Sequence, residues 1–377
     1  MEESSQSATT VTTTTVESST PTTSNTPTPT APATPATPAT PAAPVTPTVP
    51  STPATPTTPT TPTASVTQTT PEAAPQEDVM ESVRCDLCGQ DNYLVAYKGA
   101  LKSEEGGSAK ETYKSSGNKP TEDTIVKCNS CGLIYVNPRL KSEKIVEGYS
   151  EGADENFVSQ VEGRESTFLT GIKFIEHFTK PGKLLDIGTA SGSFLHVAKQ
   201  RGWQVYGVEP NKWLCDWTQK NYGIYVQPGT IDNLNYSEGF FDVITLWDVL
   251  EHVPNPTEVL QKCHKLLVPG GYLYLNYPDY NSYASRIMKS KWIFLLSVHL
   301  TYFTRETIGK MLEKTGFQTL KYRTHWQTLK LGYLVFRMQP YSMLLYKLGN
   351  FFVNLLRLKN LSVKYQLGQT GVIARKK

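Results

Sequence analysis

Apolar residues follow two different spacings over roughly the last 300 residues of the chain. Short, mostly apolar runs, at 184–187 and 240–246, are typical of strands buried on both faces of a parallel sheet. The stretches 164–178, 211–221 and 256–267 instead repeat their apolar residues at the spacing of an amphipathic helix. Strands that alternate with helices in this way predict an α/β fold with helices on both faces of one sheet.

The first 78 residues have a composition that sets them apart. They consist mostly of Thr, Pro, Ala and Ser and contain no Lys, Arg or aromatic residue. Frequent proline prevents helix formation and strand pairing, and there is too little apolar area to offset the loss of chain entropy. We therefore expect a disordered, extended tail over 1–78. Its lack of a charged start and an apolar centre argues against a signal peptide.

The charge of the chain weakens one class of function. The net charge is +3, and because the first 75 residues carry four acids and no base, the rest carries +7. This excess is spread out without a block of Lys or Arg, so we expect no nucleic-acid partner. No apolar run is long enough to span a bilayer, and we expect a cytoplasmic chain without a transmembrane segment.

A small-residue turn directly after the first buried strand is the richest candidate site. Asp186 stands at the end of that strand, and Gly188, Ala190 and Gly192 then let the backbone come close to a ligand at the carboxyl edge of the sheet. The next strand ends at Glu209, twenty-one residues after Gly188, where an acid can take both hydroxyls of a ribose. The pattern predicts an adenosine-containing ligand.

Two residues of this turn discriminate between adenosine ligands. The dinucleotide pattern Gly-x-Gly-x-x-Gly would need glycine where the chain has Ala190 and Ser193, which counts against NAD or FAD and against a reductase. Asp186 suits a ligand with a positively charged amino acid end. The turn resembles the loop of the class I S-adenosylmethionine-dependent methyltransferases. That loop usually reads Gly-x-Gly-x-Gly, so Ala190 is a departure from it.

This resemblance implies a Rossmann-like sheet of seven strands, with helices on both faces, whose last two strands pair antiparallel at the sheet edge. The segments 316–321 and 371–375 suit these two strands. The resemblance also implies S-adenosylmethionine as the cofactor. The residues predicted to contact it are Asp186, Gly188, Ala190, Gly192, Phe194, Glu209, Pro210, Ile231 and Trp247.

Four of the six cysteines form two Cys-x-x-Cys-Gly motifs. Each motif lets two thiolates converge on one ion, and two motifs together predict a closed tetrahedral site for structural zinc, with disulfides as the alternative. A site with four protein ligands has no open position, so the metal should not be catalytic. The predicted ligands are Cys85, Cys88, Cys128 and Cys131. The other two, Cys215 and Cys263, lie in helical patterns and are expected in the core.

The run from Cys131 to Arg139 resembles the junction in a subgroup of methyltransferases that carry a zinc ribbon ahead of the catalytic domain. That subgroup includes sugar C-methyltransferases. The resemblance implies that the ribbon and 141–164 cover the substrate side of the pocket, with Tyr149 near the substrate. A packing role for Tyr149 stays equally open.

A second segment with candidate chemistry, 247–252, should emerge at the same sheet edge as the turn. It contains Asp-Val-Leu-Glu-His, which resembles the family segment that lines the transfer site. Methyl transfer often removes a proton from the acceptor, so His252 is a candidate base with Glu251 as its partner. Further on, the run His-Leu-Thr-Tyr-Phe-Thr offers His299 as a second candidate, with Tyr302 beside it. A structural role is the alternative for each histidine.

An insertion at 326–361 is rich in aromatic, leucine and basic residues. Helices there could cap the pocket, dimerise or make weak contact with a membrane surface, and packing on the parent domain is our expectation. Before it, Thr304 can cap a helix. The full capping box is predicted to be missing, because Thr307 stands where an acid or amide would be needed.

These patterns divide the chain into a tail at 1–78, a zinc ribbon at 79–140 and a methyltransferase domain at 141–377, the last with a core at 165–325, a helical insertion at 326–361 and a last strand at 370–376. The predicted function is O- or C-methylation of a small molecule or glycan, with a sugar as first choice by analogy. The alternative is a zinc-ribbon interaction or nucleic-acid-binding protein whose Rossmann-like domain binds the cofactor without transferring methyl. The sequence leaves monomer and dimer open.

Overall fold

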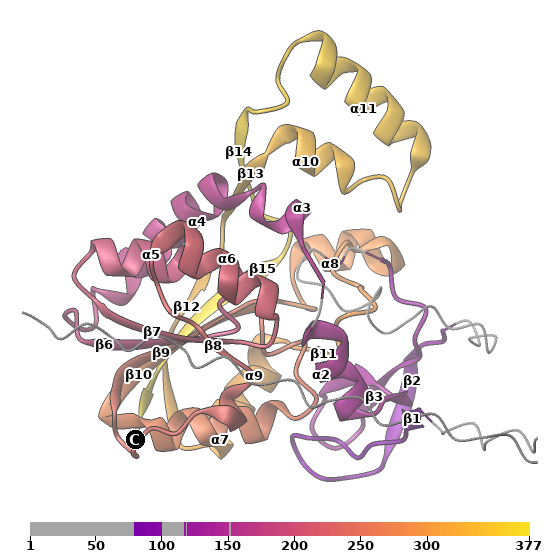
Figure 1. The fold of residues 1–377 in the computed structure, drawn as a ribbon. Helices are drawn as coiled ribbons and strands as arrows, with labels where there is room; N and C mark the ends of the chain where they lie inside the picture. The colour runs from indigo at the N-terminus through magenta and orange to yellow at the C-terminus, as the bar shows by residue number, and fades with distance from the viewer. Residues whose placement is uncertain (1–78, 100–116, 118, 151) are drawn as a thin grey trace, which may run out of the picture. The chain divides into compact units, whose positions relative to one another are not determined.

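The computed structural model describes residues 79–99, 117, 119–150 and 152–377. The tail predicted at 1–78 lies outside these residues. A central sheet carries helices on both faces, and a smaller sheet built largely from N-terminal residues lies beside it (Figure 1). The chain thus has the predicted Rossmann-like α/β architecture with an added N-terminal unit.

Seven strands form the central sheet, and in chain order they are β6 (Lys183–Ile187), β7 (Gln204–Glu209), β8 (Gln227–Pro228), β9 (Phe241–Trp247), β10 (Leu267–Pro278), β12 (Phe317–Thr324) and β15 (Gln369–Lys376). Their order across the sheet is β12, β15, β10, β9, β6, β7, β8. The neighbouring pairs β10–β9, β9–β6, β6–β7 and β7–β8 are parallel. Strand β15 is antiparallel to both of its neighbours, β10 and β12. This confirms the predicted antiparallel pairing of the last two strands.

Helices cover both faces of this sheet. One face carries α4 (Val161–Ile175), α5 (Ser193–Gln200) and α6 (Lys212–Tyr222), and the other carries α7 (Pro256–Leu266) and α9 (Arg305–Lys314), as Figure 1 shows. Each helix turns its apolar stripe to the sheet. Cys215 of α6 and Cys263 of α7 lie in the two buried clusters, as predicted.

The strand order reverses at β6, because β7 extends the sheet on one side and β9 on the other. Open α/β sheets bind their ligands beyond the carboxyl ends of the strands at such a point. The small-residue turn follows β6, and the segment 247–252 begins at the end of β9. The topology therefore brings the two predicted site segments together.

The smaller sheet consists of β2 (Tyr93–Tyr97), β3 (Ile125–Cys128), β4 (Ile134–Val136) and β11 (Thr301–Tyr302), in the order β11, β4, β3, β2. A separate strand pair joins β1 (Met80–Glu81) to β5 (Arg139–Leu140). We call residues 79–140 the ribbon. Because β11 comes from the middle of the catalytic region, the ribbon sheet contains strands from both parts of the chain.

Hydrogen bonds attach the ribbon to α7 and α9, the two helices on one face of the central sheet. Thr257, in the first turn of α7, donates its backbone N–H to Asp86 Oδ2 at 2.9 Å and its hydroxyl to the same oxygen at 2.6 Å. Lys314, at the end of α9, donates from Nζ to the Leu87 carbonyl at 2.7 Å. The remaining short elements are α2 (Ser142–Ser150), α3 (Glu155–Val158), η1 (Ile231–Asn233), α8 (Tyr283–Met288) and η2 (Lys289–Lys291).

The predicted absence of a capping box before α9 is wrong. Thr307 Oγ1 accepts the Thr304 N–H at 2.9 Å, and Thr304 Oγ1 accepts the Thr307 N–H at 3.2 Å. The threonine hydroxyl is an acceptor within reach of the N-cap backbone, so it replaces the acid or amide of the usual motif.

The insertion contains two helices between paired strands: β13 (Gln327–Lys330), α10 (Leu331–Phe336), α11 (Met343–Leu355) and β14 (Ser362–Tyr365). Strand β13 is fixed to α4, where Thr167 Oγ1 accepts the Thr328 N–H at 2.8 Å. The prediction that the insertion packs on the parent domain is wrong for α11, which buries only Val353. The reason is that α11 contacts α10 through one side, and its broad apolar side is left exposed.

Gly192 permits a close approach between α5 and α6. Its φ is 65°, and a β-carbon there would lie 2.2 Å from Thr218 Cγ2. We expect Gly192→Ala to lower the free energy of unfolding by about 1–2 kcal/mol for the left-handed backbone, and by about 1–3 kcal/mol more for the overlap. Gly202→Ala is the matched control, because Gly202 has a φ of 87° and no atom within 4 Å of that position. Equal losses in denaturant unfolding would contradict this explanation.

Candidate functional site

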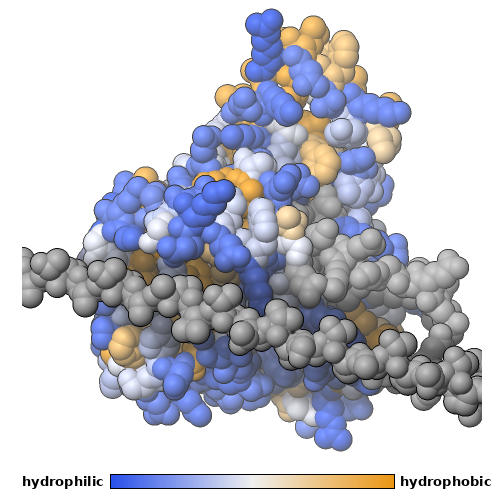
Figure 2. Space-filling model, in the orientation of Figure 1, coloured by the Kyte–Doolittle hydropathy of each residue, from blue (hydrophilic) through white to orange (hydrophobic). Residues whose placement is uncertain are grey.

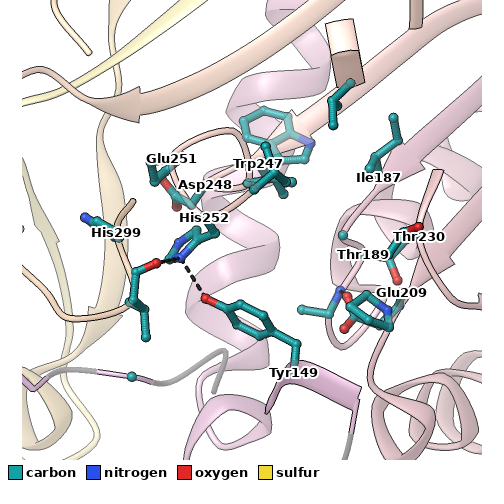
Figure 3. A pocket seen from close by; sticks show the side chains of 18 of the residues that line it. Tyr149, Ile187, Thr189, Glu209, Thr230, Trp247, Asp248, Glu251, His252 and His299 are labelled. Atoms are coloured by element: carbon teal, nitrogen blue, oxygen red, sulfur yellow. Dashed lines mark hydrogen bonds between the residues drawn. The ribbon is translucent and has the colours of Figure 1, made fainter. Parts of the chain in front are cut away.

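A cavity of about 350 Å³ opens at the carboxyl ends of β6, β7 and β9. Its wall also includes residues of α2, which follows the ribbon in the chain, of α4, and of β13 in the insertion. Figure 3 shows Glu209 and His252 on two sides of this cavity. The two ends have different chemistry.

At the first end a buried acid is held by backbone N–H groups. Glu209 Oε2 accepts the Ala190 N–H at 2.8 Å, and Oε1 accepts the Asn211 N–H at 3.0 Å. Burial raises the pKa of Glu209 to about 7, although the two N–H groups oppose the shift. Each carboxylate oxygen keeps a further lone pair for a ligand hydroxyl.

The turn after β6 presents more polar groups to the same end. Asp186 Oδ1 accepts the Thr245 hydroxyl at 2.6 Å, and burial, with the charge of Glu209 as a lesser cause, raises the pKa of Asp186 well above its usual value. Thr189 Oγ1 is buried without a hydrogen-bond partner among the residues that the structure describes. Two buried acids and a free hydroxyl fit a ligand that carries a positive charge and hydroxyl groups.

The opposite end centres on His252. Its Nδ1 lies 2.9 Å from the Val298 carbonyl oxygen and 2.9 Å from the Tyr149 hydroxyl (Figure 3). A carbonyl oxygen can only accept, so we assign the ring proton to Nδ1, which leaves the Nε2 lone pair for another partner. Burial lowers the pKa of His252 to about 4, and the ring is therefore neutral at physiological pH. A neutral imidazole with a free Nε2 can act as a base.

Glu251 and His299 complete this end. His299 Nδ1 lies 2.8 Å from the Phe294 carbonyl oxygen, and its ring centre is 4.6 Å from that of His252. Neither carboxyl oxygen of Glu251 has a hydrogen-bond partner within the described part of the chain, and burial raises its pKa well above the usual value. One ligand atom from each of the three residues lies within 4.8 Å of the others, so the group could also hold a metal ion.

Residues 162–322 match a family model described as a methyltransferase domain. They form the methyltransferase domain of this chain. Ubiquinone biosynthesis O-methyltransferases of Pseudomonas aeruginosa and Coxiella burnetii are 31% identical to the chain over 134 residues. These matches cover 33% of this chain, 58% of the Pseudomonas protein and 57% of the Coxiella protein. The chain thus spans somewhat more than half the length of these relatives.

Two solved structures are also similar to the methyltransferase domain. A SAM-dependent methyltransferase from Archaeoglobus fulgidus is 19% identical, with 59% of this chain and 100% of that chain covered and a TM-score of 0.41. A possible histamine N-methyltransferase from Thermotoga maritima is 20% identical, with 58% and 91% covered and a TM-score of 0.40.

Most of the residues predicted to contact the cofactor line the cavity of the methyltransferase domain: Asp186, Gly188, Ala190, Glu209, Pro210, Ile231 and Trp247. Gly192 and Phe194 do not. Gly192 is the N-cap of α5, and Phe194 is buried with its ring 4.9 Å from that of Trp247. Phe194 faces inward because the first turn of α5 packs on the sheet.

The predicted catalytic residues divide in the same way. Glu251, His252 and His299 line the cavity of the methyltransferase domain, whereas Tyr302 does not. The Tyr302 side chain is buried in the core beneath the ribbon, where its hydroxyl donates to the Leu296 carbonyl at 3.3 Å. It lies on β11, so its position serves the pairing between that strand and β4.

The methyltransferase cavity has a polar wall that the sequence analysis missed. The Asp248 carboxylate accepts hydrogen bonds from the side-chain amides of Gln369 at 2.6 Å, Asn276 at 2.6 Å and Gln327 at 3.2 Å. Burial raises the pKa of Asp248 to about 6, with the positive charge of Arg164 opposing the shift. The sequence could have indicated Asp248, because it directly follows a buried strand at the ligand edge of the sheet. It could not have indicated the three amides, because they come from three separate strands.

The ribbon ahead of the methyltransferase domain gathers its four predicted cysteine ligands. Their sulfur atoms all lie within 4.8 Å of one another, and the nearest pairs are Cys85 with Cys131 at 3.4 Å and Cys88 with Cys128 at 3.5 Å. None of the four forms a disulfide within the described part of the chain. Ligands at about 2.3 Å from a tetrahedral zinc ion would be separated by about 3.8 Å, so this arrangement fits a closed zinc site.

Proposed function

We propose that this chain transfers the methyl group of S-adenosylmethionine to a hydroxyl of a small-molecule acceptor, with His252 as the general base. The observation that carries the proposal is a neutral histidine across the cavity from the acid at the end of β7, with no hydrogen bond to its Nε2 from the described residues. The alternative of a nucleic-acid or interaction module is not favoured by the curated relatives. One end of the cavity suits the donor, and the other end suits the acceptor.

The residues of the chain divide the work of transfer between them. S-adenosylmethionine, when bound, supplies the methyl group as a sulfonium. Glu209 accepts the ribose hydroxyls, and the acid at Asp186 attracts the amino acid end. At the other end His252 Nε2 would take the acceptor proton as the acceptor oxygen bonds to the methyl carbon. The bond from that carbon to the sulfur would break, and S-adenosylhomocysteine would leave. Tyr149 and the Val298 carbonyl hold the ring in place through Nδ1.

A sugar is the acceptor class that we propose first. The wall formed by Asp248, Gln327 and Gln369 offers several hydrogen-bonding groups at one place, which suits a molecule with several hydroxyls. A phenol is the second candidate. It draws on the ubiquinone biosynthesis O-methyltransferases and on Phe157, Phe168 and Phe294, which give the cavity an aromatic part.

We also propose that the four cysteines of the ribbon bind one structural zinc ion and that residue 140 separates the ribbon from the methyltransferase domain. The four-sulfur donor set supports zinc, since soft thiolates favour this metal. The ion would fix Cys85 and Cys88 against the motif after β3, and so hold the ribbon in the form that contacts α7 and α9.

Calorimetric titration with S-adenosylhomocysteine tests the donor end. Only the ionised carboxylate of Glu209 accepts both ribose hydroxyls, and its pKa is about 7. Affinity should therefore be constant at alkaline pH and fall toward tenfold per pH unit as the pH drops below that value. Glu209→Gln should bind about 10–100-fold more weakly, because its amide keeps one acceptor oxygen and loses one charge-assisted hydrogen bond worth about 1.5–3 kcal/mol. It should also lose the part of the pH dependence that comes from Glu209.

The matched control for that titration is Glu313→Gln, an exposed acid of α9 outside the cavity, which should bind as the parent chain does. Affinity of the parent chain that does not change with pH would contradict the assignment of Glu209. A transfer assay with labelled donor then compares sugars with catechol-type phenols. Donor binding without transfer to any acceptor would favour the non-transferring alternative.

A further inference from the structure

Helix α11 exposes an apolar surface, and orange residues appear at the top of Figure 2 beside hydrophilic ones in blue. The side chains that form it are between 48% and 75% exposed, and we call them the α11 face: Leu344, Leu345, Leu348, Phe351, Phe352, Leu355 and Leu356. They follow one another at helical spacing along one side of α11. An adjoining side contacts α10, where a β-carbon on Gly349 would lie 3.1 Å from Val335. An exposed apolar patch of this kind marks an interaction site.

The charge of the residues around the α11 face indicates the chemistry of its partner. From 326 to 365 the chain has six Lys and Arg residues and no Asp or Glu. Four of the six are exposed, namely Lys347, Arg357, Lys359 and Lys364. A second copy of the chain would bring like charges together at the α11 face. An anionic lipid surface would attract them instead, by about 1 kcal/mol for each basic side chain near the headgroups.

A second exposed element adds the same kind of surface. Tyr283 and Ile287 of α8 are 85% and 78% exposed, and the basic residues Arg286, Lys289 and Lys291 lie on or directly after that helix. The Tyr341 hydroxyl, in the loop between α10 and α11, donates to the Ile293 carbonyl at 3.0 Å, shortly after η2. This bond joins the insertion to the segment that follows α8 and η2. The exposed apolar and basic side chains are therefore not confined to α11.

We propose that the α10–α11 hairpin docks on the surface of a membrane that contains anionic phospholipid. The α11 face enters the interfacial layer, and the basic side chains contact the headgroups, as in other amphipathic helices that lie in the plane of a membrane. Within the described part of the chain, no helix is both long and apolar enough to cross a bilayer. The contact that we propose is with the membrane surface. Arg337, the C-cap of α10, lines the cavity, so the docked hairpin borders the acceptor site.

Co-sedimentation of the full chain with phosphatidylcholine vesicles, with and without phosphatidylglycerol, tests this proposal. We expect binding to the vesicles with phosphatidylglycerol, weakened by salt. The double variant Leu344→Asp with Phe351→Asp should lose it, because two charges would have to enter the interfacial layer. Neutralising Lys347 and Arg357 to glutamine should weaken it about thirtyfold, at about a fivefold loss for each charge.

Tyr225→Asp is the matched control, because Tyr225 is 73% exposed, lies outside the cavity and is far from the insertion in the chain. It should bind vesicles as the parent chain does. All variants should keep their affinity for S-adenosylhomocysteine, which shows that they are folded. The proposal would be overturned if the folded chain did not bind the vesicles with phosphatidylglycerol. A dimer in sedimentation velocity that the Leu344 and Phe351 changes separate would also overturn it, because the α11 face would then join two copies.

Discussion

Replacing His252 with alanine should lower kcat by about 10²–10⁴-fold, the range that a general base contributes, and should leave the affinity for S-adenosylhomocysteine unchanged. The expectation follows from the position of the ring, whose Nδ1 is fixed by the Val298 carbonyl while Nε2 is free. Because the donor-binding groups lie at the other end of the cavity, binding and turnover should separate in this variant.

The pH dependence of kcat gives an independent test of the same role. The base acts in its neutral form, and burial lowers the pKa of His252 to about 4. At saturating donor, kcat of the parent chain should therefore stay level down to about pH 5 and fall only below it, where an ordinary histidine would lose activity near pH 6.5. His252→Gln cannot take up a proton, so its residual kcat should lack this acid limb.

Two other histidines make the test specific. His196→Ala is a matched control, since His196 stacks on Tyr222 outside the cavity and should keep its kcat. His299→Ala should cost less than His252→Ala, because His299 supports the ring of His252 at a centre distance of 4.6 Å. A kcat for His252→Ala within a few-fold of the parent value would refute the assignment, and a larger loss for His299→Ala would move the base to that residue.

Replacing Cys128 with serine should abolish the zinc binding that we propose and destabilise the ribbon. Structural zinc in small domains contributes an apparent free energy of about 10–16 kcal/mol at neutral pH, and a serine hydroxyl is a poor substitute for a thiolate. Buried apolar residues of the ribbon, among them Leu87 and Leu133, lie in the same cluster as Cys85 and Cys128, so loss of the ion should disturb their packing. We expect zinc content to fall from one ion per chain toward none by mass spectrometry, with an earlier thermal transition.

Cys263→Ser is the matched control for the zinc test. Cys263 is fully buried in α7 but lies outside the cysteine cluster, so this variant should lose some stability and retain its zinc. Two results together would show that the four thiols have another role. The purified protein would contain no zinc, and a strong chelator would leave the thermal stability of the parent chain unchanged.

The sequence was informative wherever one residue type is required by local geometry or by a ligand. Gly188 and Gly192 have φ near 65°, and the four cysteines occur as two short motifs, so the order of residues alone locates both features. Acids at strand ends, such as Glu209, followed from the alternation of strands and helices. These residues depend on a few neighbours in the chain.

Features that depend on distant parts of the chain were missed. Gln327 and Gln369 reach Asp248 from strands that a sequence pattern does not place beside it. Phe194 was predicted at the ligand, yet the direction of its side chain depends on how α5 packs. For α11, apolar composition suggested burial. Apolar residues are common on protein surfaces as well, so composition alone could not decide.

The pairing of β11 with β4 has a consequence for how the protein is made. Thr301 and Tyr302 form the outer strand of the ribbon sheet, yet they are translated long after the cysteines. A nascent ribbon would present an open strand edge until they arrive, and such edges invite aggregation. Expression of residues 79–140 alone should therefore give poorly soluble protein even with zinc present, and supplying a peptide that contains 301–302 should improve its recovery.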